Sequence, residues 1–181
     1  YSVKESVFPF NKFPGVDTIL VTDDVQARQI GLSHFTVNPE APDELKALVN
    51  RLESQGRHVG GVVYLWNYQP RSTRRRTAGL RPAVLDESFH FFRNCLQALA
   101  QPGRTQPIRV LAASVICEPV TGRDLDPGRS LILGYVRSAP QELPNLACHH
   151  LDLEGVDAEA DARWIAEELR AWRPPREIGI R

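Results

Sequence analysis

VDTILVTDDVQARQIG, residues 16–31, has the pattern of a buried strand that runs into a short helix. Thr18–Thr22 is apolar and β-branched, which favours a strand, and a short helix is predicted near Gln26–Ile30. A dinucleotide-binding fold places glycines in this first turn, because the backbone must turn sharply and approach a pyrophosphate closely. Here the turn reads Thr-Asp-Asp-Val, residues 22–25, and its two carboxylates would repel phosphate. The stretch therefore predicts an α/β fold whose first turn does not bind a dinucleotide.

The rest of the chain alternates strand-like and helix-like segments. Short apolar runs predict strands at 34–37, 62–66, 108–112, 147–153 and 177–180, and the run at 62–66, VVYLW, is typical of a strand buried on both faces. Apolar residues at helical spacing predict helices at 42–56, 86–101 and 160–172. Residues 130–144, SLILGYVRSAPQELP, fit a helix or a strand equally well. This alternation predicts an α/β fold, a mainly parallel sheet with helices on both faces.

Length and composition fit one globular lobe. The chain has 181 residues, a formal net charge of zero and 42% apolar residues, values that do not point to nucleic acid or an anionic membrane. Cys95, Cys117 and Cys148 are an odd count at wide spacing, which argues against a disulfide framework and predicts a reducing cytoplasm. The absence of methionine, even at position 1, predicts that the chain begins inside a longer polypeptide. We expect one Rossmann-like lobe over 16–181, with 1–15 as a linker or first strand.

The ends of the first strands offer one candidate site. Asp23, Asp24 and Asn38 would meet there if the strands are parallel, because ligands of such sheets bind at the carboxyl ends of the strands. A free-standing α/β enzyme could use the two aspartates to hold a metal or a sugar. The alternative is that Asp23 or Asp24 caps the short helix, which is the more common role of such residues.

A basic loop offers a second candidate. Residues 67–82 contain Arg71, Arg74, Arg75, Arg76 and Arg81, and the first four are the candidate interaction surface. Such a loop suits phosphate or an acidic partner such as a carrier protein, and would make the chain an interaction module. A solvated loop is the alternative and the more common interpretation, since nucleic-acid readers usually show a broader basic face.

Two further motifs are predicted to be structural. The pair Gly60-Gly61 precedes the strand at 62–66, whereas a phosphate loop lies between a strand and a helix, so the pair predicts a tight turn. His149 and His150 are adjacent on a predicted strand and should point to opposite faces, so they cannot easily ligate one metal. The sequence predicts no metal site.

A reductase constellation cannot be assembled from this chain. Ser114 follows the strand at 108–112, a usual place for a catalytic residue. A short-chain reductase also needs a tyrosine whose phenol pKa is lowered by a lysine. Tyr135 has Ala139 four residues later, and no lysine occurs after Lys46. We therefore predict no catalytic residue in this segment.

The order of the segments resembles the structural subdomain of the ketoreductase of modular type I polyketide synthases. The motifs that carry the resemblance, over nearly the whole chain, are YSVK at 1–4, VVYLWNY at 62–68, DESFHFFRNCLQALAQ at 86–101, PIRVLAAS at 107–114 and DPGRSLILGYVRSAPQELPNLACHHLDLE at 126–154. Glu5 or Ser6 stands where the family commonly has a tryptophan. The resemblance implies that the ambiguous segment at 130–144 is a helix.

The resemblance also implies a role. It implies a truncated Rossmann-like lobe, similar to short-chain dehydrogenases, that binds no cofactor. A separate catalytic lobe of the same polypeptide would carry NADPH and the catalytic Lys, Ser, Tyr and Asn, and would reduce β-ketoacyl groups on an acyl carrier protein. The present lobe would pack against that catalytic lobe, with neighbouring synthase domains as further partners.

Overall fold

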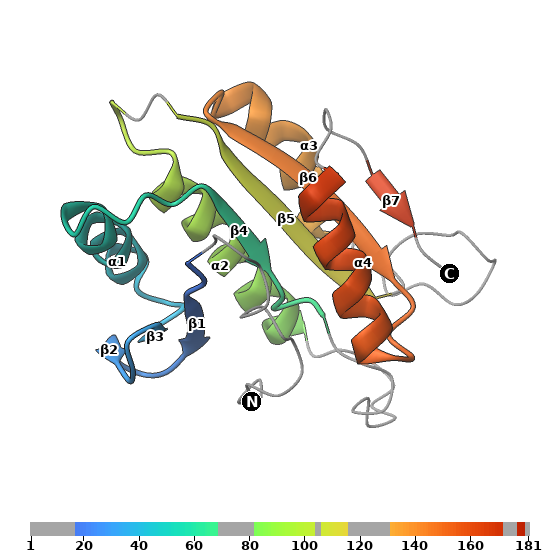
Figure 1. The fold of residues 1–181 in the computed structure, drawn as a ribbon, viewed down its shortest axis with the longest axis horizontal. Coiled ribbons are helices and arrows are strands. Elements are labelled where there is room, and N and C mark those ends of the chain that lie inside the picture. The colour runs from blue at the N-terminus through green and yellow to red at the C-terminus, as the bar shows by residue number, and fades with distance from the viewer. Residues whose placement is uncertain (1–16, 69–81, 104–105, 116–130, 172–176, 180–181) are drawn as a thin grey trace.

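The computed structural model describes residues 17–68, 82–103, 106–115, 131–171 and 177–179. The elements follow one another as strands and helices along these ranges (Figure 1). They are β1 (Leu20–Asp23), β2 (Arg28–Gln29), β3 (His34–Val37), α1 (Pro42–Ser54), β4 (Gly61–Tyr64), α2 (Pro82–Leu99), β5 (Ile108–Val115), α3 (Leu131–Glu142), β6 (Leu146–Leu153), α4 (Ala158–Ala171) and β7 (Glu177–Gly179). The segment at 130–144, which fits two patterns in sequence, forms the helix α3 that the family resemblance implies.

The strands form two sheets. The smaller has the order β1-β3-β2, in which β1 is parallel to β3 and β2 is antiparallel to it. The larger has the order β4-β5-β6-β7, and all of its pairings are parallel. The predicted mainly parallel sheet is therefore confirmed.

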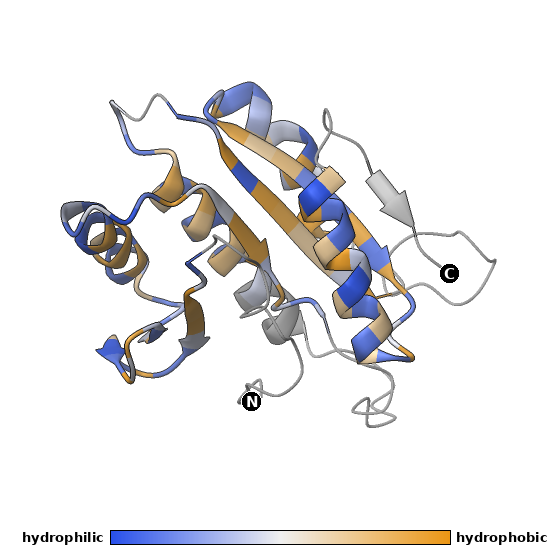
Figure 2. Cartoon of the chain, in the orientation of Figure 1, coloured by the Kyte–Doolittle hydropathy of each residue, from blue (hydrophilic) through white to orange (hydrophobic). Residues whose placement is uncertain are grey.

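Helices cover both faces of the larger sheet. Alternate residues of β5 belong to two separate cores, with Val110 and Ala112 in the larger core beside α2 and α3, and Leu111 and Ala113 in the smaller core beneath α4. Figure 1 shows α4 crossing one face of β5 and β6, with α2 and α3 on the other. Both strands are coloured as hydrophobic over most of their length in Figure 2, as expected of strands buried on both faces.

The crossovers of the larger sheet differ in hand. Each one steps from a strand to the next in the same direction, from β4 to β7. Because α2 and α3 lie on one face and α4 on the other, the β6–α4–β7 crossover has the opposite hand to the two before it. Nearly all parallel crossovers are right-handed, so at least one of these connections has the rarer hand.

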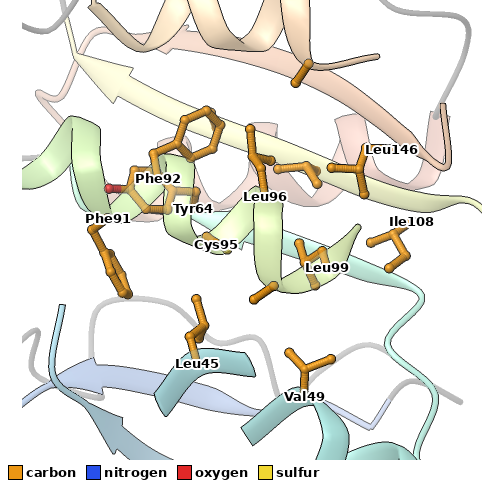
Figure 3. Close-up of a cluster of buried hydrophobic side chains, with 14 of the residues drawn as sticks. Leu45, Val49, Tyr64, Phe91, Phe92, Cys95, Leu96, Leu99, Ile108 and Leu146 are labelled. Carbon is orange, nitrogen blue, oxygen red and sulfur yellow. The ribbon is translucent and has the colours of Figure 1, made fainter. Parts of the chain in front are cut away.

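The larger core centres on α2. Phe92 and Leu96 have no exposed surface and lie between the sheet and α1, together with the ring of Tyr64 from β4 (Figure 3). The Tyr64 hydroxyl donates a 2.7 Å hydrogen bond to the carbonyl oxygen of Ser88 on α2, so its polar group is satisfied inside this core. The strand and the helix are thereby joined by both apolar packing and a hydrogen bond.

Two expectations about strands and helices are corrected. The helix predicted near Gln26–Ile30 is absent, and that segment contains the strand β2. It is held by Thr36, whose hydroxyl accepts a bond from the Arg28 amide at 3.1 Å and donates one to the Gln26 carbonyl at 3.0 Å. The run at 62–66 was predicted to be buried on both faces, but β4 lies at the edge of its sheet and Val62 is only half-buried.

No helix in the described ranges has the length and hydropathy needed to cross a membrane.

Candidate functional site

The turn after β1 was the first candidate site, and the structure brings its residues together. The parallel pairing of β1 with β3 sets Asp23 beside Val37, so that Asp24 and Asn38 follow the two strand ends. Their polar atoms serve the turn itself: Asp24 Oδ1 accepts a 2.7 Å bond from the Val25 amide. The alternative role as a helix cap is wrong, because no helix follows β1 anywhere in the fully described segment 24–33.

Asn38 is also used by the backbone around it. Its Oδ1 accepts a 2.9 Å bond from the Glu40 amide, and its Nδ2 donates a 3.5 Å bond to the Val25 carbonyl. Its own amide donates a 2.8 Å bond to the Glu44 carboxylate on α1. The predicted proximity of the strand ends is thus confirmed, but the groups brought together close a loop onto α1.

A buried polar cluster lies near the carboxyl ends of β5 and β6. Ser114 Oγ is 2.7 Å from His150 Nε2 and donates a 3.4 Å bond to Asp152 Oδ1, and each of these residues is at most 1% exposed. The Ser114 hydroxyl thus lies between the imidazole of His150 and the carboxylate of Asp152, with the shorter contact to the imidazole.

This cluster differs from a nucleophilic triad in its connectivity. In a triad the base accepts the hydroxyl proton and a third group orients the base. Here the Asp152 carboxylate contacts the Ser114 hydroxyl itself, not the imidazole of His150, so it does not take the place of the group that orients the base. Ser114 was expected just after a strand, but it is the penultimate residue of β5 and is fully buried. The arrangement joins two strands by hydrogen bonds.

Two further buried polar contacts hold α4 on the other face of the larger sheet. The Tyr68 hydroxyl donates a 2.7 Å bond to Asp161 Oδ2, and His149 Nδ1 lies 3.1 Å from Glu168 Oε1. Burial and the hydrogen bond and charge of Asp161 raise the pKa of Tyr68. Burial likewise raises the pKa of Asp161, although hydrogen bonds from Tyr68 and from the Gly155 backbone oppose part of that rise. Polar contacts therefore hold both the first turn and a later turn of α4.

The histidine pair behaves as predicted. His150 points toward Ser114 on one face of the sheet, and His149 points toward Glu168 of α4 on the other. Among the described residues no group of three His, Cys, Asp or Glu side chains is arranged to hold a metal. Gly61, expected in a tight turn, instead begins β4 against the backbone of Arg109.

Of the two remaining candidates, Tyr135 lies in the described part of the chain and the basic loop does not. The Tyr135 ring packs edge-on against Phe89, with 5.0 Å between ring centroids, and α3 contains no lysine. Arg71, Arg74, Arg75 and Arg76 lie outside the described residues, so the basic loop stays a prediction. Sequence reasoning missed the Tyr68–Asp161 and Ser114–His150 contacts, whose partners are 93 and 36 positions apart and leave no spacing pattern.

Comparison with known proteins places the fold. No protein-family profile and no curated protein matches the chain. A structure containing the adenylation, ketoreductase and pseudo-Asub domains of a keto acid-selecting NRPS module matches with a TM-score of 0.76 and 18% identity, over 93% of this chain and 14% of that one. An N-terminal ketoreductase from the macrolactin assembly line matches with a TM-score of 0.60 and 16% identity, over 89% of this chain and 32% of that one.

A smaller enzyme completes the comparison. A short-chain dehydrogenase from Mycobacterium smegmatis matches with a TM-score of 0.61 and 10% identity, over 90% of this chain and 80% of that one. The chain thus spans a minor part of the two ketoreductase-containing chains and corresponds to most of a single dehydrogenase subunit. The resemblance suggested by the order of motifs is confirmed at the level of fold: the chain has the Rossmann-like α/β fold of these ketoreductases and short-chain dehydrogenases.

Proposed function

We propose that the chain is the non-catalytic structural lobe of a ketoreductase in a multienzyme synthase. It supports a separate lobe of the same polypeptide that binds NADPH and reduces β-ketoacyl groups on a carrier protein. In this role the chain holds no cofactor and supplies no catalytic residue. Its contribution is a folded surface against which the catalytic lobe packs.

The observation that carries this proposal is the strand β2. A dinucleotide needs a helix N-terminus directly after the first strand, where backbone amides and the helix dipole bind the pyrophosphate. In this chain the position after β1 is occupied by a turn containing Asp24 and by β2, which pairs antiparallel with β3. Both the glycines and the helix that would bind a pyrophosphate are replaced.

The buried Ser114 gives secondary support. A reductase serine must reach the substrate carbonyl, whereas this hydroxyl is fully buried and lies between His150 and Asp152. Tyr135 lies on α3, which contains no lysine, and its ring packs against Phe89 of α2, so α3 does not supply the tyrosine–lysine pair of a short-chain reductase. These residues favour a packing role over a reductase active site.

Cofactor titration tests the proposal on the chain itself. NADPH is added to residues 1–181 while nicotinamide fluorescence is followed, with a short-chain dehydrogenase that has an intact glycine-rich turn as the positive control. We expect no saturable signal from this chain up to millimolar NADPH. A dissociation constant in the low micromolar range would contradict the proposal. It would favour the alternative of an α/β enzyme whose site lies at the carboxyl ends of the strands.

The coding region supplies an independent test. The reading frame beyond Arg181 is expected to encode a glycine-rich strand-to-helix turn followed by the Lys, Ser, Tyr and Asn of a reductase. The same region with those residues replaced would assign the chain to an inactive ketoreductase. A stop codon shortly after Arg181 would leave the chain without the lobe that it is proposed to support.

A further inference from the structure

Helix α4 packs on a much smaller apolar core than α2 and α3 do. Among the described residues, 21 buried residues form the larger core, whereas seven form the smaller core beneath α4. Of those seven, α4 itself contributes only Ile165, and Leu169 packs against this core while partly exposed. Because apolar stabilisation grows with the area removed from water, this term holds α4 less strongly than it holds α2.

The buried side of α4 is also more polar than that of the other helices. Four of its residues are buried, and two of these are carboxylates, Asp161 and Glu168. The outward side is solvated, and its exposed residues include Arg163, Trp164 and Glu167. In α1 and α3, by contrast, the buried residues are all apolar: Leu45, Leu48, Val49 and Leu52 in α1, and Ile132, Leu133, Val136 and Ala139 in α3.

Polar contacts take the place of part of the missing apolar packing. Asp161 Oδ2 accepts the 2.7 Å bond from the Tyr68 hydroxyl, and Glu168 Oε1 lies 3.1 Å from His149 Nδ1. Once α4 leaves the sheet, these groups can bond to water, so each contact contributes only modestly to keeping α4 closed. The two carboxylates also recover the solvation that burial removes.

Further carboxylates act on Asp161 at the start of α4. In the described part of the chain, the titratable groups around it are Tyr68, from the loop after β4, and Asp157 and Glu154, from the turn between β6 and α4. Burial is the main cause that raises the pKa of Asp161, and the charges of Asp157 and Glu154 add to it. Hydrogen bonds from Tyr68 and the Gly155 backbone oppose part of the rise. An open form, in which this carboxyl is solvated, therefore binds its proton less tightly than the closed form does.

We propose that α4 opens as a unit while β5, β6 and the larger core stay folded, and that ionisation of Asp161 favours the open form. In this step the contacts with Tyr68 and His149 break and Ile165 leaves the smaller core. The sheet face beneath it becomes exposed to water. The chain then has two folded forms that differ in the position of α4, and this inference does not rest on the proposed function.

Hydrogen exchange of the whole chain tests the opening on the wild type. The protein is exchanged in D₂O at pH 7, and peptides from the central part of α4, from α2 and from β6 are followed by mass spectrometry. Exchange through a local opening is faster than exchange that requires global unfolding. We expect protection factors in α4 at least tenfold lower than those in α2 and β6. Equal protection in all three elements would overturn the proposal, because α4 would then open only when the whole chain unfolds.

A variant in the larger core tests whether the opening is independent. Ile132→Val on α3 trims a side chain that is 1% exposed in the larger core, a change mild enough to retain the fold. We expect it to lower the protection of α2 at least threefold, because global unfolding becomes easier. The protection of α4 should change less than twofold, because the larger core stays intact when α4 opens. An equal fall in α2 and α4 would show that the two are coupled and would contradict independent opening.

The pH dependence tests the role of Asp161. Because the open form gains from ionisation of this carboxyl, the protection of α4, corrected for intrinsic exchange rates, should fall as the pH rises from about 4 to 7. Asp161→Asn removes the ionisable group and keeps an oxygen that can accept from Tyr68. Its fall over the same range should be at least threefold smaller. An equal fall in the wild type and in Asp161→Asn would overturn the assignment of Asp161 as the group that favours opening.

Discussion

The hydroxyl of Tyr68 donates a 2.7 Å hydrogen bond to Oδ2 of Asp161, joining the loop after β4 to the first turn of α4. Tyr68 is 7% exposed and Asp161 is 5% exposed, so water cannot replace the bond if it is lost. This contact is one of two buried polar contacts that hold α4 on a small apolar core. The Tyr68 hydroxyl therefore contributes to holding the first turn of α4 in place.

Removal of that donor is the first prediction. Tyr68→Phe keeps the ring but leaves the buried Asp161 carboxylate without the hydroxyl, and it should lower the free energy of unfolding by about 1–3 kcal/mol. Urea unfolding followed by circular dichroism measures the change. Tyr135→Phe is the matched control, because that residue contacts Phe89 through its ring, and its effect should stay within about 0.5 kcal/mol. Equal effects of the two variants would contradict the role of the bond.

Asp161 gives the second prediction, through pH. Because its pKa is raised in the folded chain, the folded state binds more protons than the unfolded state between the two pKa values. The stability that this carboxyl contributes therefore falls as the pH rises through that window. The free energy of unfolding of the wild type minus that of Asp161→Asn should grow as the pH falls from 7 toward the ordinary aspartate pKa of about 4. A pH-independent difference would show that Asp161 titrates normally.

Ser114 is the subject of the third prediction. Ser114→Ala deletes the hydroxyl that contacts His150 Nε2 and donates to Asp152 Oδ1, which leaves two buried polar groups without this partner. We expect a loss of about 2 kcal/mol in urea unfolding. Ser54→Ala, whose exposed hydroxyl bonds to the Arg51 carbonyl, should change stability by less than about 0.5 kcal/mol. A Ser114→Ala variant as stable as wild type would mean that the cluster contributes nothing to holding β5 against β6.

The fourth prediction concerns Gly155, which follows β6. Its φ of +68° suits glycine, and a Cβ there would lie 2.6 Å from Cγ1 of Val115. Gly56, which follows α1, has a similar φ of +74° and open space around it. Both alanine variants bear the backbone cost of about 1–2 kcal/mol, but Gly155→Ala adds a steric clash worth about 1–3 kcal/mol.

A double variant isolates that clash. Val115→Ala in the Gly155→Ala background should recover part of the lost stability, so that the two effects are not additive. Additive losses would show that the clash relaxes without cost.

The buried cysteines provide the fifth prediction. Burial raises the pKa of both Cys95 and Cys148 to about 12. The thiolate fraction at pH 8 is then on the order of a thousandfold below that of an ordinary thiol, so alkylation by iodoacetamide should be slow in the folded chain. The experiment uses a Cys117→Ser background and counts labels by mass spectrometry, with urea-unfolded protein as the control. Rapid labelling of the folded chain would mean that this core opens readily.

The sequence was sufficient for elements with strong local patterns. Pro42 at the start of α1 and the apolar spacing from Leu45 to Leu52 define a helix with one buried face, and the structure confirms it. The run that became β6 is strand-like over most of its length and pairs throughout with β5. In these cases the local preference and the tertiary packing agree, which is why a single sequence is enough.

Elements that depend on distant partners could not be predicted. The segment near Gln26–Ile30 was interpreted as a helix, but its conformation is set by Thr36 on a neighbouring strand, a contact without a local signal. The edge position of β4 depends on strand order, which one sequence does not specify. The proximity of Asp24 and Asn38 followed from parallel pairing, yet their role in closing the loop required the hydrogen bonds to be seen.

The Thr36 hydroxyl, bonded to both the Arg28 amide and the Gln26 carbonyl, also limits how a nucleotide site could be engineered into this lobe. Glycines in place of Asp23 and Asp24 would not create such a site by themselves, because the helix that must follow them would need the residues now paired in β2. The pairing of β2 with β3 would have to be given up before any affinity for a nucleotide is gained. A redesign of this turn therefore has to replace β2 as a whole.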